Sequence, residues 1–218
     1  MKFRYTKTWN EILFQFEEVK KKCNDIIDKL QEKGISKNDP RTEGMVHVRQ
    51  FCNTLACIPL RIQQFAGCRS NKDFILKLFG IQSYCDLQKL LEDFNKNAKC
   101  GFITGVQFAL ENCIGQIIED KTGQKPSPKF KDKCTKIIKI AGMSDRRKLK
   151  LNRLMLLAYI RNTLHSGGIH QWDSLRRKIR GVYYTLKKGK KVDCATWNHI
   201  FFLLWHSLDL YERIFLRL

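Results

Sequence analysis

The sequence predicts a mainly α-helical protein, a bundle of about six to seven helices with one small β-hairpin near residues 181–194. Apolar residues recur every three to four positions along most of the 218 residues, which is the period of an amphipathic helix. Only 4 prolines interrupt the chain, and the alternation typical of a strand is confined to the region after Gly181. No change of composition marks a linker. We therefore expect one compact unit over 1–218, with N-terminal helices in 1–100 and a helical core in 101–218.

Local signals define the helices of the N-terminal half. Thr8 and Glu11 have the spacing of a capping box, which predicts that a long amphipathic helix starts directly after Thr8. Pro59 is expected to kink or end the second helix, because its ring removes a backbone donor and clashes with the preceding turn. A short element is predicted near residues 73–79, followed by a further helix. A seam between the two halves is placed near Gly101.

The C-terminal half is predicted to hold further helices and the hairpin. A basic amphipathic helix is expected over 129–141. Ser144 is expected to cap the next helix, whose residues 154–160 are apolar on every side and therefore predicted to be buried. Gly189 is placed at the hairpin turn. A strong apolar stripe that starts at Trp197 predicts the final core helix.

Positive charge is concentrated in one half of the chain. The formal net charge is +20. Residues 1–120 hold 18 Lys+Arg against 15 Asp+Glu, a net of +3, whereas residues 121–218 hold 23 against 6, a net of +17. Like charges packed together oppose the compact state, so such a surface usually faces an anionic partner. Nucleic acid is the first expectation, and acidic lipid or an acidic protein are the alternatives.

The cysteines and the hydropathy pattern predict the cellular setting. The 9 cysteines are an odd number without a C-x-x-C pair, which disfavours both a disulfide framework and a zinc site. The start of the sequence has no signal-peptide pattern, and no apolar run approaches the ~18 residues of a membrane span. We therefore expect a cytoplasmic protein with no membrane association, no metal and no cofactor.

One segment carries chemistry, the run Tyr-Ile-Arg-Asn-Thr-Leu-His-Ser-Gly-Gly over 159–168. Arg161 and His165 stand four residues apart, so on a helix both side chains can reach one ligand. A guanidinium that holds a phosphate and an imidazole that moves a proton suffice to cleave RNA without a metal. The alternative is an ordinary helix end, where basic side chains meet the negative end of the dipole and glycine follows as a cap.

This segment resembles the signature of the HEPN superfamily, small helical domains common in toxin–antitoxin, abortive-infection and CRISPR systems. The resemblance covers roughly 101–218, and its specific core is Arg-Asn-x-x-His. Three residues separate Arg161 from His165, fewer than in most members of the family, and His170 is the next histidine downstream.

The resemblance implies a metal-independent endoribonuclease that cleaves single-stranded RNA as a homodimer, in a prokaryotic defence or toxin system that also supplies a protein partner. His165 would transfer the proton, Arg161 would stabilise charge on the phosphate, and Asn162 would orient the pair or the substrate. The ribose 2′-oxygen would attack the adjacent phosphate, leaving a cyclic phosphate and a 5′-hydroxyl. The alternative function is a non-catalytic nucleic-acid-binding or assembly subunit on the same fold, and a weaker one is a regulator that docks an acidic protein.

Basic residues flank this segment on both sides and are expected to bind nucleic-acid phosphates. They are Arg146, Arg147, Lys150, Arg153, Arg176, Arg177, Lys178, Arg180, Lys187 and Lys188. Trp172, Tyr183 and Tyr184 lie among them as candidates to stack on unpaired bases, although one of two neighbouring tyrosines in a strand points inward. Glu111, a polar residue in an apolar helix, is expected either to face solvent or to orient Arg161 or His165.

Overall fold

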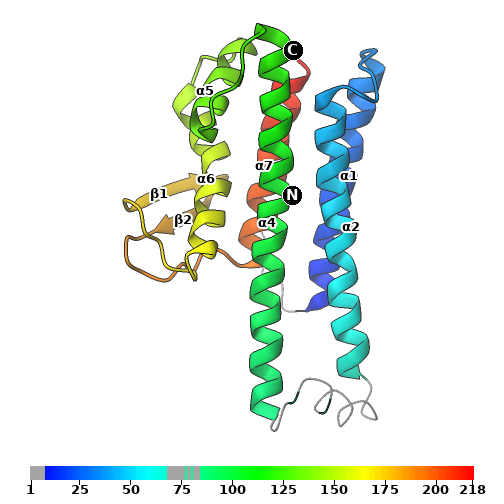
Figure 1. Ribbon diagram of the computed structural model, residues 1–218, viewed down its shortest axis with the longest axis vertical. Helices are drawn as coiled ribbons and strands as arrows, with labels where there is room; N and C mark the ends of the chain where they lie inside the picture. The colour runs from blue at the N-terminus through cyan, green and yellow to red at the C-terminus, as the bar shows by residue number, and fades with distance from the viewer. Residues whose placement is uncertain (1–7, 68–76, 78–79, 81–83) are drawn as a thin grey trace.

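A computed structural model describes residues 8–67, 77, 80 and 84–218 (Figure 1). The predicted fold class is confirmed: the described part of the chain is mainly helical, with a single two-stranded antiparallel hairpin. The elements are α1 (Trp9–Glu32), α2 (Pro40–Gly67), α4 (Tyr84–Thr122), α5 (Phe130–Ile140), α6 (Arg147–His165), β1 (Leu175–Ile179), β2 (Val182–Leu186) and α7 (Trp197–Phe215).

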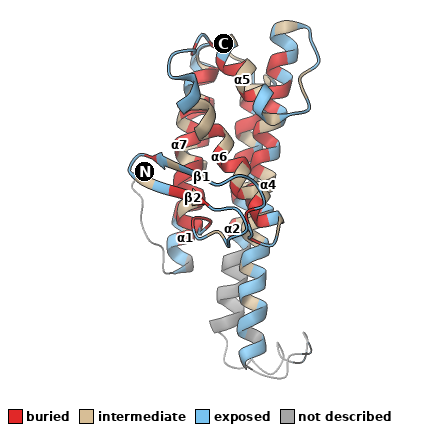
Figure 2. Cartoon of the chain, turned by 90° about the vertical axis from the view of Figure 1, so that its left-hand side faces the viewer, coloured by how far each residue is buried: buried red, intermediate tan, exposed pale blue. Residues whose placement is uncertain are grey.

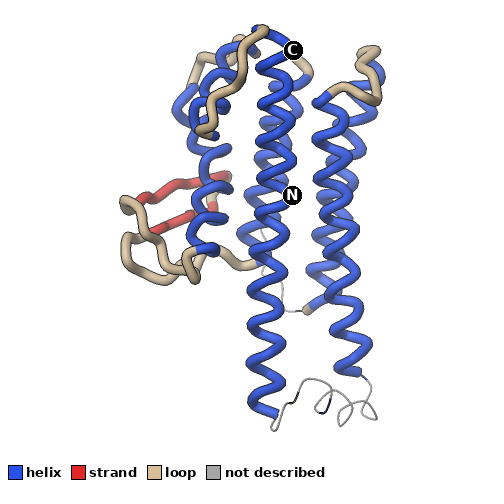
Figure 3. Tube along the Cα trace, viewed as in Figure 1, coloured by secondary structure: helices blue, strands red, loops and turns tan. Residues whose placement is uncertain are grey.

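The long helices α1, α2, α4 and α7 run along the long axis of the molecule, and α5, α6 and the hairpin lie to one side (Figures 1 and 3). Helix α2 packs against α1 and α4, α1 packs against α7, and α6 packs against α4, α5 and α7. Buried residues follow the faces that these helices turn toward one another, whereas the first turns of α4 are mostly exposed (Figure 2). One continuous apolar core joins the six helices named above and the hairpin.

Aromatic rings occupy the centre of this core. The ring of Phe16 on α1 meets Phe102 of α4 at 5.2 Å and the α7 residues Trp197 and Phe201 at 5.6 and 4.8 Å between centroids. Phe16, Phe102 and Phe201 have no solvent exposure. Edge-to-face contacts of this kind stabilise the core beyond the area they bury. The cluster therefore links the N-terminal helices to the C-terminal half.

The N-terminal helices partly follow the sequence prediction. The capping box is confirmed: the Glu11 amide donates to Thr8 Oγ1 at 3.3 Å, and the Thr8 amide donates to the Glu11 carboxylate at 2.9 Å. Helix α2 runs through Pro59 to Gly67, so of the two alternatives, a kink or an end at Pro59, the end is wrong. Helix α4 is continuous across Gly101, because the roughly 1 kcal/mol cost of one helical glycine is small beside the packing of a long helix. The short element predicted near 73–79 lies outside the described residues, apart from Lys77.

The α6 helix begins differently from the prediction. Its N-cap is Arg146, which has a left-handed backbone with φ of 48° and no side-chain capping bond. Ser144 contributes only its backbone carbonyl, which accepts the Arg147 amide at 3.2 Å, so the predicted serine cap is wrong. The apolar stretch 154–160 is buried as expected except at Met155 and Tyr159, which are partly buried. The basic helix predicted over 129–141 is confirmed as α5.

The hairpin lies earlier in the chain than predicted. Its turn is Arg180-Gly181, where both residues have positive φ, 48° and 94°, as a tight two-residue hairpin turn requires. Gly189 instead belongs to a later loop, in which its amide donates to the His170 carbonyl at 2.7 Å. The predicted turn at Gly189 is therefore wrong, because three consecutive basic residues hide the first strand, β1, in the sequence.

The described residues give two further findings. No described helix has the length and apolar character needed to cross a membrane. All cysteines within the described ranges are free thiols, and burial raises the pKa of Cys23 to about 12. A thiol with so high a pKa is protonated at neutral pH, which suits its place in the core.

Candidate functional site

The last turn of α6 presents Arg161 with its guanidinium already oriented. Arg161 Nε and Nη2 both donate to the side-chain oxygen of Asn162, at 3.0 and 2.8 Å. The arginine is partly buried, and its Nη1 makes no bond to any described residue. Asn162 therefore fixes one edge of the guanidinium, and the other edge can meet an anion.

His165 lies one helical turn further along the same face and is exposed. Its Nε2 is 2.8 Å from the hydroxyl of Thr104 on α4, a residue 61 positions earlier in the chain. This bond fixes the ring plane and engages one nitrogen, which leaves Nδ1 as the nitrogen that can exchange a proton with a ligand. The sequence analysis did not identify Thr104, because no local signal connects it to the motif.

Helix α2 packs against α4 beside Thr104, at Gly105. At the neighbouring Gly105, a Cβ atom would overlap the Phe51 ring of α2, so glycine allows the two helices to approach closely at this level. Packing between α2 and α4 thus holds the stretch of α4 that carries Thr104. The N-terminal half of the chain contributes to the geometry of the site in this way.

His170, the second histidine considered for the motif, is fully buried and has a structural role. Its Nδ1 lies 2.9 Å from the Thr163 hydroxyl, and its Nε2 lies 3.1 Å from the Asp173 carbonyl oxygen. Both ring nitrogens are therefore occupied. Backbone bonds with Gly189 and Lys190, 2.7 and 3.0 Å long, also tie this histidine to the lysine-rich loop (residues 187–191). Of the two histidines, His165 is therefore the candidate for proton transfer.

Glu111 does not orient either motif residue, so that expectation is wrong. Its carboxylate forms a 2.9 Å ion pair with Lys133 of α5, and both side chains are largely shielded from solvent. The alternative expectation, a plainly solvent-facing position, is also incorrect. Because α5 packs against α4 here, the pair serves to join these two helices.

The ten basic residues selected from the sequence fall into separate groups. Arg146 and Arg147 are exposed at the start of α6, while Lys150 is engaged locally, 2.9 Å from Asp145. Lys187 and Lys188 are exposed in the lysine-rich loop. The four arginine and lysine residues of the hairpin region, Arg176, Arg177, Lys178 and Arg180, divide between its two faces and its turn.

Arg153 lies in a cationic cluster that connects α6, the hairpin turn and α7. Burial lowers its pKa, and the neighbouring charges of Arg213 and Arg180 lower it further. Asp209 opposes this effect, but its carboxylate also pairs with Lys22 at 2.8 Å. Arg213, which the sequence analysis missed, is therefore close enough to Arg153 for their charges to interact, as Arg180 is, and only the fold reveals this.

The hairpin residues confirm that one of the two tyrosines points inward. Tyr184 is fully buried, and its hydroxyl donates to the His199 carbonyl of α7 at 2.8 Å. Tyr183 is 48% exposed on the opposite face. Trp172 is also exposed, and its ring lies 5.6 Å from that of His170. Tyr183 and Trp172 thus remain as candidates for stacking.

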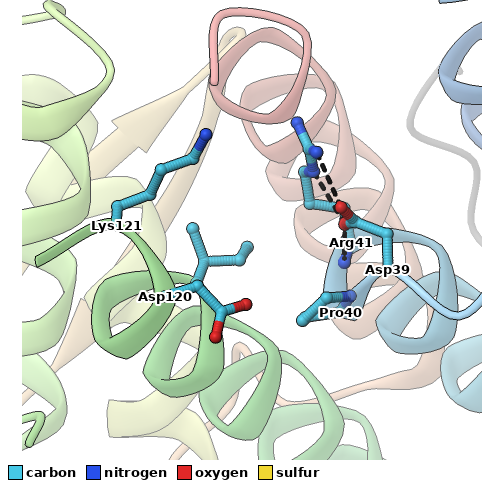
Figure 4. Close-up of a pocket in the computed structure, with 6 residues that line it drawn as sticks. Asp39, Pro40, Arg41, Asp120 and Lys121 are labelled. Carbon is cyan, nitrogen blue, oxygen red and sulfur yellow. Dashed lines mark hydrogen bonds and ion pairs between the residues drawn. The ribbon is translucent and has the colours of Figure 1, made fainter. Parts of the chain in front are cut away.

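A polar hollow elsewhere in the molecule is not connected to the motif. It is lined by the first turn of α2 and the last turns of α4 (Figure 4). There Arg41 makes a bidentate pair with Asp39, with 2.8 and 2.7 Å bonds, and this pairing lowers the pKa of the Asp39 carboxyl. Sixteen residues of α4 separate Asp120 in this hollow from Thr104, about 24 Å along the helix. Since its arginine is already paired with Asp39 and a second carboxylate, Asp120, also lines it, this hollow is not a candidate for anion binding.

The structure thus presents Arg161 and His165 on one face of α6, each oriented by a different neighbour. Side chains of these two types can hold a phosphate and move a proton. The described residues contain no group of three or more His, Cys, Asp and Glu side chains arranged to hold a metal ion. No protein-family model matches the chain, and no curated protein or solved structure matches it either.

Proposed function

We propose that this protein is a cytoplasmic, metal-independent endoribonuclease of the HEPN type, which cleaves single-stranded RNA as a homodimer within a prokaryotic defence or toxin system. The observation that supports the proposal most is that Arg161 and His165, near the end of α6, are each held by hydrogen bonding with a neighbouring side chain. His165 is exposed and held by Thr104, and one turn away Arg161 is held by Asn162. Two oriented side chains of these types are what phosphodiester cleavage by the ribose 2′-oxygen requires.

In the proposed reaction His165 takes the proton of the ribose 2′-hydroxyl. The 2′-oxygen then forms a bond to the adjacent phosphorus, and the bond from phosphorus to the 5′-oxygen breaks. Arg161 stabilises the negative charge that develops on the non-bridging phosphate oxygens. The leaving 5′-oxygen needs a proton from a second acid, which His165 of a second copy would supply. The products are a 2′,3′-cyclic phosphate and a 5′-hydroxyl.

A non-catalytic nucleic-acid-binding or assembly subunit is the second candidate. It is favoured by the basic surface itself, which is exposed at the start of α6, on the hairpin and in the lysine-rich loop whether or not the motif reacts. In this case Arg161 would only hold a phosphate. Because each neutralised phosphate releases counterions, such a binder would lose RNA affinity steeply with salt and would form no product.

The chain is expected to cleave an unstructured RNA in the presence of EDTA and to leave cyclic-phosphate and 5′-hydroxyl ends. The reason is that the attacking nucleophile is the substrate's own 2′-oxygen and the charged groups are side chains. Gel analysis with end-specific labelling measures both properties. The control is the same RNA methylated at every 2′-oxygen, which must remain intact. Salt-sensitive RNA binding without cleavage would contradict the nuclease proposal and favour the second candidate, a non-catalytic binding subunit.

Thr104 is expected to act as a positioning residue for His165. Thr104→Val keeps the shape but removes the hydroxyl, so the imidazole loses its anchor and kcat should fall about 10- to 100-fold with KM for RNA unchanged. Thr104→Ser keeps the hydroxyl and should retain kcat within about threefold. Nitrogen NMR of the His165 ring should show loss of the hydrogen bond at Nε2 in the valine variant only. A valine variant with the parent's kcat and ring spectrum would exclude this role.

A further inference from the structure

The two faces of the hairpin have different chemistry. The register places Lys178 opposite Tyr183, and Arg176 opposite Thr185. These four side chains share one face, which we name the hairpin outer face, because residues directly opposite in an antiparallel pair project to the same side. The other face carries Tyr184 and is packed against the core. The outer face is therefore the side of the hairpin that meets solvent.

On the hairpin outer face two cations surround one aromatic ring. The guanidinium carbon of Arg176 lies 4.4 Å from the centroid of the Tyr183 ring, and Lys178 Nζ lies 5.0 Å from it. The ring nonetheless keeps 48% of its surface exposed. Cations that contact the ring hold its orientation, so the exposed aromatic surface is presented in a fixed position.

This cationic face lacks a local counter-charge. Residues 174–192 contain eight Lys and Arg and no Asp or Glu. Throughout the described ranges, no ion pair joins Arg176 or Lys178 to a carboxylate. A surface that concentrates uncompensated positive charge has its most favourable contacts with an anionic ligand. An exposed ring at the centre of that charge adds a preference for a ligand that also has flat, apolar surfaces.

We propose that the hairpin outer face binds single-stranded RNA, with Tyr183 stacking on an unpaired base and Arg176 and Lys178 holding the flanking phosphates. Unpaired bases have free faces that stack on aromatic rings, whereas the bases of a duplex are covered by their neighbours. The two cations occupy alternate positions of one strand, about 7 Å apart along it. Lys178 is directly opposite the ring, and Arg176 is its diagonal neighbour. The inference depends on the proposed function for the identity of the partner, RNA, and is independent of the cleavage step.

The test measures binding of an unstructured RNA methylated at its 2′-oxygens, which the proposed chemistry cannot cleave. Fluorescence anisotropy with the full chain is expected to show affinity reduced about 5- to 100-fold in Tyr183→Ala, the loss expected for one stacked base. Tyr183→Phe keeps the ring and should bind within about twofold of the parent. Affinity for an RNA duplex of equal length should change by less than about twofold in both variants.

Two further variants separate stacking from general effects. Phe14→Ala removes an aromatic side chain of similar exposure, 55%, from α1, and it should leave RNA affinity unchanged. A variant carrying both Arg176→Gln and Lys178→Gln should lower the slope of log affinity against log salt by about 1.4, the value for two phosphates of a single strand.

The outcomes distinguish this inference from the nuclease proposal. Parent-like binding by Tyr183→Ala, or an equal loss in Phe14→Ala, would overturn the inference whatever the chain cleaves. A loss in the double glutamine variant alone would indicate a purely electrostatic surface, which suits an acidic protein equally well, and would also overturn it. If the expected binding pattern is found but unmodified RNA stays intact in EDTA, the nuclease proposal fails and this binding surface stands.

Discussion

Replacing His165 by alanine is expected to lower the rate of RNA cleavage about 100- to 10,000-fold, the usual contribution of a general acid–base group. RNA affinity should remain within about twofold of the parent, because the basic surface is unchanged. The exposed ring is held only at its edge by Thr104, so its removal leaves no cavity in the core. The measurement is a single-turnover cleavage assay in EDTA beside an anisotropy titration with the same RNA.

His47→Ala is the matched control for this experiment. His47 is also an exposed histidine on a helix, but it lies on α2, in the half of the chain with little net charge. Its removal should leave both cleavage and affinity at the parent level. Cleavage by His165→Ala at the parent rate would eliminate the imidazole from the chemistry and with it the proposed mechanism. Equal losses in both histidine variants would point to a general effect of the substitutions on the protein and would remove the support for a specific role of His165.

Phe16→Ala is expected to reduce the free energy of unfolding by about 3–5 kcal/mol, as large-to-small changes at buried phenylalanines do. The ring is fully buried and contacts Phe102, Trp197 and Phe201, which belong to two other helices. A loss of this size is a large part of the roughly 5–15 kcal/mol that stabilises a typical domain. Urea denaturation followed by circular dichroism provides the measurement.

Phe14→Ala provides the comparison, because it makes the same chemical change two residues away at a site that is 55% exposed. It should alter the free energy of unfolding by less than about 0.5 kcal/mol, as surface substitutions usually do. If the two variants were equally stable, the aromatic cluster around Phe16 would not be the junction of the two halves. The pair thus tests the packing of α1 directly.

Most helices could be predicted because their signals are local. The apolar stripe after Thr8 and the one that starts at Trp197 both lie within single elements, and both predictions are confirmed. The hairpin was misplaced because Arg177 sits on its inner face as a partly buried residue, where a long side chain buries its stem and keeps its charge in solvent. Alternation of apolar and polar residues, the usual strand signal, is therefore absent from β1.

The candidate site divides in the same way. The one-turn spacing of Arg161 and His165 is a property of five consecutive residues and could be proposed from the sequence. The hydrogen bond between Thr104 and His165 spans 61 residues, and the proximity of Arg213 to Arg153 depends on how α7 packs against α6. Neither of these interactions could be predicted from the sequence. His170 is also close to the motif in the sequence, but both of its ring nitrogens form hydrogen bonds inside the fold. The sequence spacing does not reveal these bonds.

The uninterrupted course of α4 bears on how the chain can be dissected. Asn95, upstream of Gly101, accepts the indole N–H of Trp197 at 2.8 Å, while Thr104, downstream, reaches the motif. An expression fragment that started at residue 101 would sever this helix in mid-span and strip one end of its contacts with α7. Biochemists who want the C-terminal half in isolation will have to keep the upstream part of α4 attached.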